Sequence, residues 1–367
     1  MSLSWIAVDA MTGYQICDLP NLDVPVIGES LCDYWSGAAE LPLPTAPREW
    51  RQATNQWATY LVLLEDDLPI WGCWVTTRKP NDGNVVPLTI ATWEAYLDKR
   101  YCGSTSYNQA IYTSIAEGVI RSFVQPSGPA FLLDVQPGTT RGDLNAQDAD
   151  DRTVLSVMKE MSGRESGPEW TVDWTLTDDN RYLPIFRIAP RIGVGAGDLP
   201  PAAVFDMPGC LTEFELAEDW TDKRGANDVM AVAIPDGNER LTSGHIAITD
   251  PIRPKLELRW TPSTSITQQS TLISHALNRL AATVDGSNTW KLTASAIAAP
   301  KRGKDWDLGD DIGYHITAPS VSEFLPDGSF NPVYGVARCI DWEYDMDDET
   351  VTPTLYSLDD LETTGGA

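Results

Sequence analysis

The chain reads YLVLLEDDLPIWGCWVTTRKP from Tyr60 to Pro80, NDGN from Asn81 to Asn84, and VVPLTIATWEAYLDKRY from Val85 to Tyr101. Apolar runs of strand length alternate here with acidic or glycine-containing turns. Asp-Gly favours a tight reversal, because glycine adopts positive φ at little cost. The stretch therefore predicts three consecutive antiparallel strands, at residues 60–64, 69–78 and 84–91. Helical spacing of the residues that follow predicts a short amphipathic helix at Trp93–Tyr101, which closes this β-meander.

The composition is that of a folded and strongly acidic protein. Its 367 residues are 42% hydrophobic and include 14 tryptophans, which is enough for two domains or one elaborated domain. The formal net charge is −27, from 53 acidic and 26 basic residues. Binding to nucleic-acid phosphates or to an anionic membrane needs a basic protein surface, so both functions are disfavoured.

The N-terminus and the cysteines indicate where the chain is made. Residues Met1–Ala10 contain no basic residue and place Asp9 inside the apolar run, so they do not resemble a signal peptide. No uncharged apolar stretch approaches the roughly 20 residues of a membrane-spanning helix. The six cysteines form no Cys-x-x-Cys pair. We therefore expect a chain made in a cytoplasm, with free and buried thiols and no membrane-spanning segment.

The remaining pattern predicts more strands than helices, so the expected fold class is β-dominated α+β. Ser106 or Asn108 is the expected N-cap of the first long helix. Each half of the chain carries a β-meander and one amphipathic helix, which raises the idea of a duplicated barrel. Helices are predicted at residues 108–123, 148–161 and 267–283, a strand at 170–176 with a hairpin partner at 183–189, and a strand pair at 228–234 and 245–249 around a turn at 235–238.

No arrangement of residues in the sequence matches a known catalytic motif. The three histidines, His245, His275 and His315, lack metal-ligand spacing and are expected to be hydrogen-bonded structural residues. The glycine-rich segment 193–197 is interpreted as a turn, and the acidic run 345–349 as a solvated hairpin turn rather than a calcium loop. Other acidic pairs, at 178–179 and 310–311, carry little information in so acidic a chain. We assign no catalytic, cofactor-binding or metal-binding residue.

The tryptophans have two interpretations. A row of exposed tryptophans could form a platform for a sugar ring. Most of them lie in predicted strands, however, so burial in a core or an interface is the favoured interpretation. Trp71, Trp74, Trp170 and Trp174 are the examples that the strand pattern places most clearly.

Several segments together resemble the minor tail proteins of long, flexible-tailed phages that infect actinobacteria. The most specific is Trp93–Tyr101, which is similar to the segment that closes the first β-domain of that family. The resemblance covers residues 60–356, while the first 40 residues match nothing in it. The other segments that carry it are Leu61–Leu64 with Pro69–Gly72, Val154–Leu155 through Gly167–Asp173, Arg224–Asp228 and Leu308–Ile312.

The resemblance implies a tail hub similar to the hub of contractile-tail baseplates. Three copies would form a ring below the tail tube, and each copy would contribute two tube-like antiparallel β-barrel domains. It implies a location at the tail tip of the virion and no enzymatic activity. The implied partners are further copies of the chain, the distal tail protein and tail tube above, other minor tail or fibre proteins below, and the tape measure protein or viral DNA in the lumen.

We expect this plan to divide the chain into four segments. They are an N-terminal β-barrel domain at 1–104, a helical linking segment with a hairpin strand at 105–180, a second β-barrel domain at 181–360 that includes helix 267–283, and a flexible tail at 361–367. The acidic balance would then repel DNA phosphates from the wall of the lumen during ejection.

Two other functions stay open from the sequence. One is a tail-associated cell-wall hydrolase or carbohydrate-binding module, for which carboxylates and tryptophans supply the residue types. The other is a cytoplasmic β-rich assembly factor.

Overall fold

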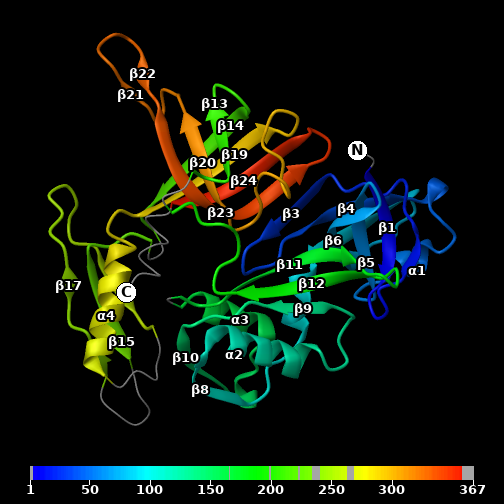
Figure 1. Ribbon diagram of the computed structural model, residues 1–367, viewed down its shortest axis with the longest axis horizontal. Helices are drawn as coiled ribbons and strands as arrows, with labels where there is room; N and C mark the ends of the chain where they lie inside the picture. The colour runs from blue at the N-terminus through cyan, green and yellow to red at the C-terminus, as the bar shows by residue number, and fades with distance from the viewer. Residues whose placement is uncertain are drawn as a thin grey trace. The chain divides into compact units, whose positions relative to one another are not determined.

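The computed structural model describes residues 3–164, 166–197, 200–221, 224–233, 240–262 and 268–357, with the side chains of all of these except 271 and 357. The chain divides into two compact units (Figure 1). Unit 1 comprises residues 1–163, 167–193 and 341–351, and unit 2 comprises residues 164–166, 194–340 and 352–367. The predicted turn at 235–238 and the predicted tail at 361–367 lie outside the described residues.

The first sheet of unit 1 contains the predicted meander. Strands β5, β6 and β7 pair antiparallel in chain order, as the Asp-Gly and acidic turns indicate. The full order is β2-β1-β5-β6-β7-β4, which leaves β2 and β4 at the edges. These strands and the short helices between them are β1 (Leu3–Asp9), β2 (Gln15–Asp18), β4 (Ser36–Pro42), η1 (Leu43–Thr45), α1 (Trp50–Ala53), β5 (Thr59–Glu65), β6 (Leu68–Arg78) and β7 (Val85–Thr92).

The segment after the meander is a short helix, as predicted, of the 3-10 type at η2 (Trp93–Lys99). Trp93 is fully buried. Its indole Nε1 donates to the Tyr60 hydroxyl at 3.0 Å, and its carbonyl accepts from Trp74 Nε1 at 3.1 Å. Helix η2 also contacts helix α3 (Val154–Ser162). The segment thus closes the sheet against the helices of the same unit.

The first long helix begins later than predicted. Residues Thr105–Ile111 form strand β8, which pairs with β10 (Arg141–Ala146), and helix α2 covers only Tyr112–Val119 before a π-helical turn, η3, at Ile120–Val124. The predicted N-caps Ser106 and Asn108 are therefore wrong. The helix begins after Ile111, which makes no side-chain cap. Pairing with a strand about 35 residues away, which local periodicity does not reveal, holds this backbone extended.

The second predicted helix is divided in two. A 3-10 turn, η4, covers Asp148–Asp150, and Asp151 takes the left-handed conformation with φ 48°. Helix α3 then begins at Val154, where Thr153 caps it by accepting a hydrogen bond from the Ser156 amide at 3.2 Å. Asp148, Asp150 and Asp151, which the sequence places in the first turn of the predicted helix, therefore lie ahead of α3. Thr153, a typical N-cap residue, is what starts the helix.

A three-stranded sheet completes unit 1. The predicted hairpin of β11 (Glu169–Leu176) and β12 (Tyr182–Ala189) is confirmed, and β9 (Leu132–Val135) pairs parallel with β12. One buried cluster joins Trp74, Trp93, Trp170 and Phe186 with side chains of α2 and α3. Strand β3 (Val26–Ser30) pairs antiparallel with residues 341–345.

The described residues of unit 2 form a large sheet, a smaller four-stranded sheet and a two-stranded one. The larger has the order β13-β20-β23-β24-β19-β14, and a separate two-stranded sheet pairs β21 with β22. Residues 341–345 of β23 are the part of that strand that belongs to unit 1. The strands are β13 (Ala203–Met207), β14 (Leu211–Asp219), β19 (Ser287–Ser295), β20 (Asp311–Ile316), β21 (Glu323–Phe324), β22 (Phe330–Asn331), β23 (Val333–Asp345) and β24 (Thr350–Ser357).

The smaller sheet of unit 2 carries helix α4 (Gln269–Ala281) on one face (Figure 1). Leu272, Ala276 and Leu280 of this helix are buried against Val229 and Ala231 of β15. The predicted antiparallel pairing of 228–234 with 245–249 is confirmed where Asp228 and Val229 pair with Ala247 and Ile246. Val232 and Ala233 pair with β16 instead, and residue 234 lies outside the described residues. The strands are β15 (Asp228–Ala233), β16 (Leu241–Thr242), β17 (Ile246–Ala247) and β18 (Glu257–Trp260).

The observed fold class agrees with the class predicted from the sequence. Strands make up 46% of the described residues and helices 15%, and one of the sheets is a half-barrel, so the class is β-dominated α+β. All six cysteines are free, and four of them are buried. Across the residues that the structure describes, no helix has the length and apolarity needed to cross a membrane.

Candidate functional site

A buried carboxyl group lies at the start of helix η2. Glu94 is only 2% exposed and lines a pocket too small to admit a water molecule. Gly72 permits this close packing, because a Cβ there would lie 2.5 Å from the Trp174 ring. The other residues that line the pocket are Glu29, Thr92, Trp93 and Val172.

The environment of Glu94 favours its neutral form. The pKa of this carboxyl is raised to about 8, and burial is the main cause. The charges of Glu29 and Asp173 act in the same direction, while hydrogen bonds from its own amide and the Thr92 hydroxyl act in the opposite direction. Within the described part of the chain, Glu94 Oε2 has no hydrogen-bond partner. Glu29, by contrast, accepts from the indole of Trp342 at 3.1 Å. Glu94 is therefore a buried carboxyl group, held mainly in its neutral form in a closed pocket.

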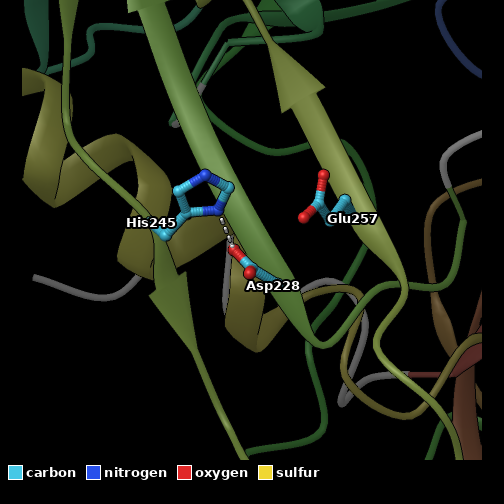
Figure 2. Close-up of side chains that lie close together, drawn as sticks. All are labelled: Asp228, His245 and Glu257. Carbon is cyan, nitrogen blue, oxygen red and sulfur yellow. Dashed lines mark hydrogen bonds and ion pairs between the residues drawn. The ribbon is translucent and has the colours of Figure 1, made fainter.

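A second group of polar side chains lies on the small sheet of unit 2. Asp228 on β15 and Glu257 on β18 are paired residues in a parallel ladder, so their side chains project from the same face. His245 directly precedes β17, and its Nδ1 lies 2.8 Å from Asp228 Oδ1 (Figure 2). One ligand atom from each of these three residues lies within 4.8 Å of the others. We call Asp228, His245 and Glu257 the triad.

Lys255 completes the charge balance of the triad. Its ammonium Nζ lies 2.6 Å from Asp228 Oδ2 and 2.6 Å from Glu257 Oε1, so it bridges the two carboxylates. Lys255 precedes Glu257 by two residues, which brings both side chains to one face in extended backbone. With a neutral imidazole, the four side chains carry a net charge of −1.

The residues of the triad differ in exposure. The Asp228 side chain is 2% exposed, whereas those of His245 and Glu257 are 42% and 46% exposed. Burial acts to raise the pKa of Asp228, but hydrogen bonds from Lys255 and His245 outweigh it and hold the pKa below its usual value. The same contacts, first with Asp228 and then with Glu257, raise the pKa of Lys255. Asp228 is therefore a buried anion beside two exposed side chains, those of His245 and Glu257.

Asn227 positions the backbone that carries Lys255 and Glu257. Its side-chain amide donates to the Pro254 carbonyl at 3.0 Å and accepts from the Leu256 amide at 2.8 Å. Asn227 is 3% exposed, so these bonds are shielded from water. The geometry of the triad therefore depends on a buried polar clamp as well as on strand pairing.

The residues singled out in the sequence do not meet in one place. His275 packs edge-on against the Trp260 ring, and His315 lies beside Tyr334, each with ring centroids 5.8 Å apart. His245 is hydrogen-bonded, as predicted, but its carboxylate partners come from residues 17 and 12 positions away and no spacing motif identifies them. Only the pairing of the strands, which the sequence does not reveal, identifies these carboxylate partners of His245.

The glycine-rich and acidic segments are structural. Segment 193–197 is irregular, as predicted, and carboxylates of Asp310 and Asp311 accept from the Val194 and Ala196 amides, each at 2.6 Å. Asp345 turns the chain between β23 and β24 by accepting from the amides of Asp347 and Asp348. The predicted hairpin turn is thus confirmed.

The tryptophans named in the sequence are packed in unit 1. Trp71, Trp74 and Trp170 are at most 1% exposed, and Trp174 is half-buried against Tyr60 and Gly72. Burial is the favoured interpretation of these residues, and it is confirmed. These four do not form an exposed platform for a sugar.

Comparison with known proteins identifies the fold. No family model and no curated protein sequence matches the chain. Several solved structures do match the chain. The 43 kDa tail protein of prophage MuSo2 from Shewanella oneidensis matches with a TM-score of 0.61 at 11% identity, over 98% of this chain and 99% of that one. A tail protein from Neisseria meningitidis MC58 matches with a TM-score of 0.57 at 12% identity, over 97% of both chains.

A third solved structure also matches the chain. Prophage tail protein gp18 from Listeria monocytogenes EGD-e matches with a TM-score of 0.53 at 10% identity, over 96% of this chain and 94% of that one. At these identities the likeness concerns the fold. The chain therefore shares, along nearly its whole length, the fold of phage tail proteins.

Proposed function

We propose that this chain is a non-enzymatic structural subunit of a phage tail, located at the tail tip, where three copies form a hub ring below the tail tube. The observation that carries the proposal is the likeness to three tail proteins over 96–98% of the chain. A match to one domain alone would support a shared module, whereas a match along the chain supports a shared role in the tail.

The division into two β-rich units supports a trimer. A tail tube with six-fold symmetry would meet a ring of three copies if each copy supplied two similar β-structures. The copies would bind one another, the distal tail protein and tube above, and minor tail or fibre proteins below. The tape measure protein or DNA would pass through the lumen without specific binding.

The charge supports a channel for DNA. With 53 acidic against 26 basic residues, a ring of three copies would carry a large negative charge. A negative lumen repels phosphates and prevents DNA from adhering to the wall during ejection. In a ring reconstruction we expect Asp and Glu side chains to line the lumen, and a lumen lined by Lys and Arg would contradict this proposal.

Analysis of purified particles tests whether the chain is a tail component. We expect mass spectrometry of gradient-purified virions, and of tails separated from heads, to detect the chain in both. An assembly factor would stay in the soluble fraction of the lysate, so its presence only there would contradict the proposal.

An activity assay tests the non-enzymatic part. Purified chain incubated with peptidoglycan or arabinogalactan is expected to release no soluble fragments. Release that disappears when a single carboxylate is replaced would show that the chain is a cell-wall hydrolase.

A further inference from the structure

We propose that Asp228, His245 and Glu257 form a binding site for one Zn²⁺ ion per chain, and that the Lys255 ammonium occupies the position of the ion when no metal is bound. The proposal concerns unit 2 by itself and does not depend on the function in a tail. It rests on the ligand types, their geometry, the charge balance and the exposure of the side chains.

The ligand set suits zinc. Zn²⁺ binds imidazole nitrogen and carboxylate oxygen, and three protein ligands with a fourth position for solvent make a common tetrahedral arrangement. Mg²⁺ and Ca²⁺ prefer oxygen ligands alone, so His245 selects against them. Asp228 lies on β15 and Glu257 on β18, and His245 directly precedes β17 (Figure 2). Both β17 and β18 pair with β15, so strand pairing brings the three residues together.

The geometry needs only side-chain movement. Ligand atoms around tetrahedral zinc lie about 3.4 Å apart, given bonds of about 2.1 Å, and those of the triad lie within 4.8 Å of one another. Asp228 is buried and held, so it supplies a fixed ligand. His245 and Glu257 are more than 40% exposed and can rotate toward it without displacing the core.

The charge balance already includes a cation. Lys255 Nζ lies 2.6 Å from an oxygen of each carboxylate, which is where an ion bound to both would lie. The Lys255 side chain is 56% exposed, so its ammonium can return to water at small cost. When the Lys255 ammonium moves into water and Zn²⁺ takes its place, the two carboxylates and the ion together are neutral, whereas the two carboxylates and Lys255 together carry −1. Lys255 thus acts as a competitor that weakens zinc binding.

Calorimetric titration of Zn²⁺ into the tag-free full-length chain tests the proposal. We expect one saturable site per chain in the wild type, lost in His245→Ala and in Glu257→Gln, whose side chains are exposed enough to be replaced without unfolding. His315→Ala is the matched control: it removes an exposed histidine of unit 2 that lies outside the triad, and it should bind as the wild type does. Lys255→Met should bind Zn²⁺ at least about fivefold more tightly.

Two results would overturn the proposal. The first is the absence of a saturable site in the wild-type chain, which would leave Asp228, Lys255 and Glu257 as an internal ion-pair network alone. The second is unchanged binding in His245→Ala, which would place any zinc elsewhere. Thermal unfolding of each variant without metal confirms folding, and Mg²⁺ at the same concentration should produce no binding heat.

Discussion

Replacing Glu94 by Gln removes an ionisable group from a place where the charged form is costly. Gln has nearly the same shape and stays neutral at every pH, so the packing around the pocket is retained. The carboxyl is 2% exposed, with Glu29 of β3 and Asp173 of β11 as its acidic neighbours. We therefore expect Glu94→Gln to stabilise unit 1 at neutral and alkaline pH, and to do so less as the pH falls.

The magnitude follows from the difference in pKa between folded and unfolded chains. The pKa is about 8 when folded and 4.5 as the ordinary value. Between these values the folded chain holds a proton that the unfolded chain has released, so wild-type stability falls as pH rises. The slope is about 1.4 kcal/mol per pH unit, so roughly 3 kcal/mol is lost between about pH 5 and pH 7.5. Below about pH 4.5 the Glu94 carboxyl no longer lowers the stability of the wild type, and above about pH 8 the loss of stability stays constant.

Urea unfolding at several values of pH measures this effect. Tryptophan fluorescence reports mainly on unit 1, which contains ten of the 14 tryptophans, including Trp93 and Trp174 of the pocket. The free energy of unfolding of Glu94→Gln minus that of the wild type should increase steadily from pH 5 to pH 8. Glu40→Gln is the control, because it makes the same change at an exposed position on β4 of the same sheet. A flat difference for Glu94→Gln would refute the reasoning.

Three further substitutions test the packing of unit 1. Trp93→Ala removes a fully buried ring and its bond to a tyrosine hydroxyl, so denaturant unfolding should show a loss of about 3–5 kcal/mol; a neutral result would mean that the ring is exposed. Thr153→Ala removes the cap of α3 and should cost about 1 kcal/mol by the same assay, whereas Thr153→Ser should cost less. Gly72→Ala places a methyl group 2.5 Å from the Trp174 ring and should lower the free energy of unfolding by about 1–3 kcal/mol. A stability equal to that of the wild type would contradict the close packing at Gly72.

Local patterns were enough to predict the meander and the hairpin. Asp82-Gly83 and the acidic turn after Glu65 mark reversals that need no distant partner, and the alternation of Trp170 to Leu176 shows one buried face. Helix α2 was predicted too long because strand β8 pairs with β10, and no local feature of residues 105–111 reveals that distant partner.

For a related reason, neither the buried Glu94 nor the triad could be predicted from the sequence. Glu94 follows Trp93 in an amphipathic segment, and the sequence contains nothing that distinguishes a buried glutamate from an exposed one. Asp228, His245 and Glu257 are brought together by a parallel and an antiparallel pairing to the same strand. A search by spacing looks for ligands on one helix or one loop, so it misses ligands that strand register brings together.

The central claim is that three copies of this chain form a ring at the tail tip. The most direct test is a cryo-electron microscopy reconstruction of the tail tip of the phage that carries the chain. We expect three copies of the chain around the tail axis, in contact with the end of the tail tube and with acidic side chains toward the lumen. Density for the chain in another position, or in a number other than three about that axis, would contradict it.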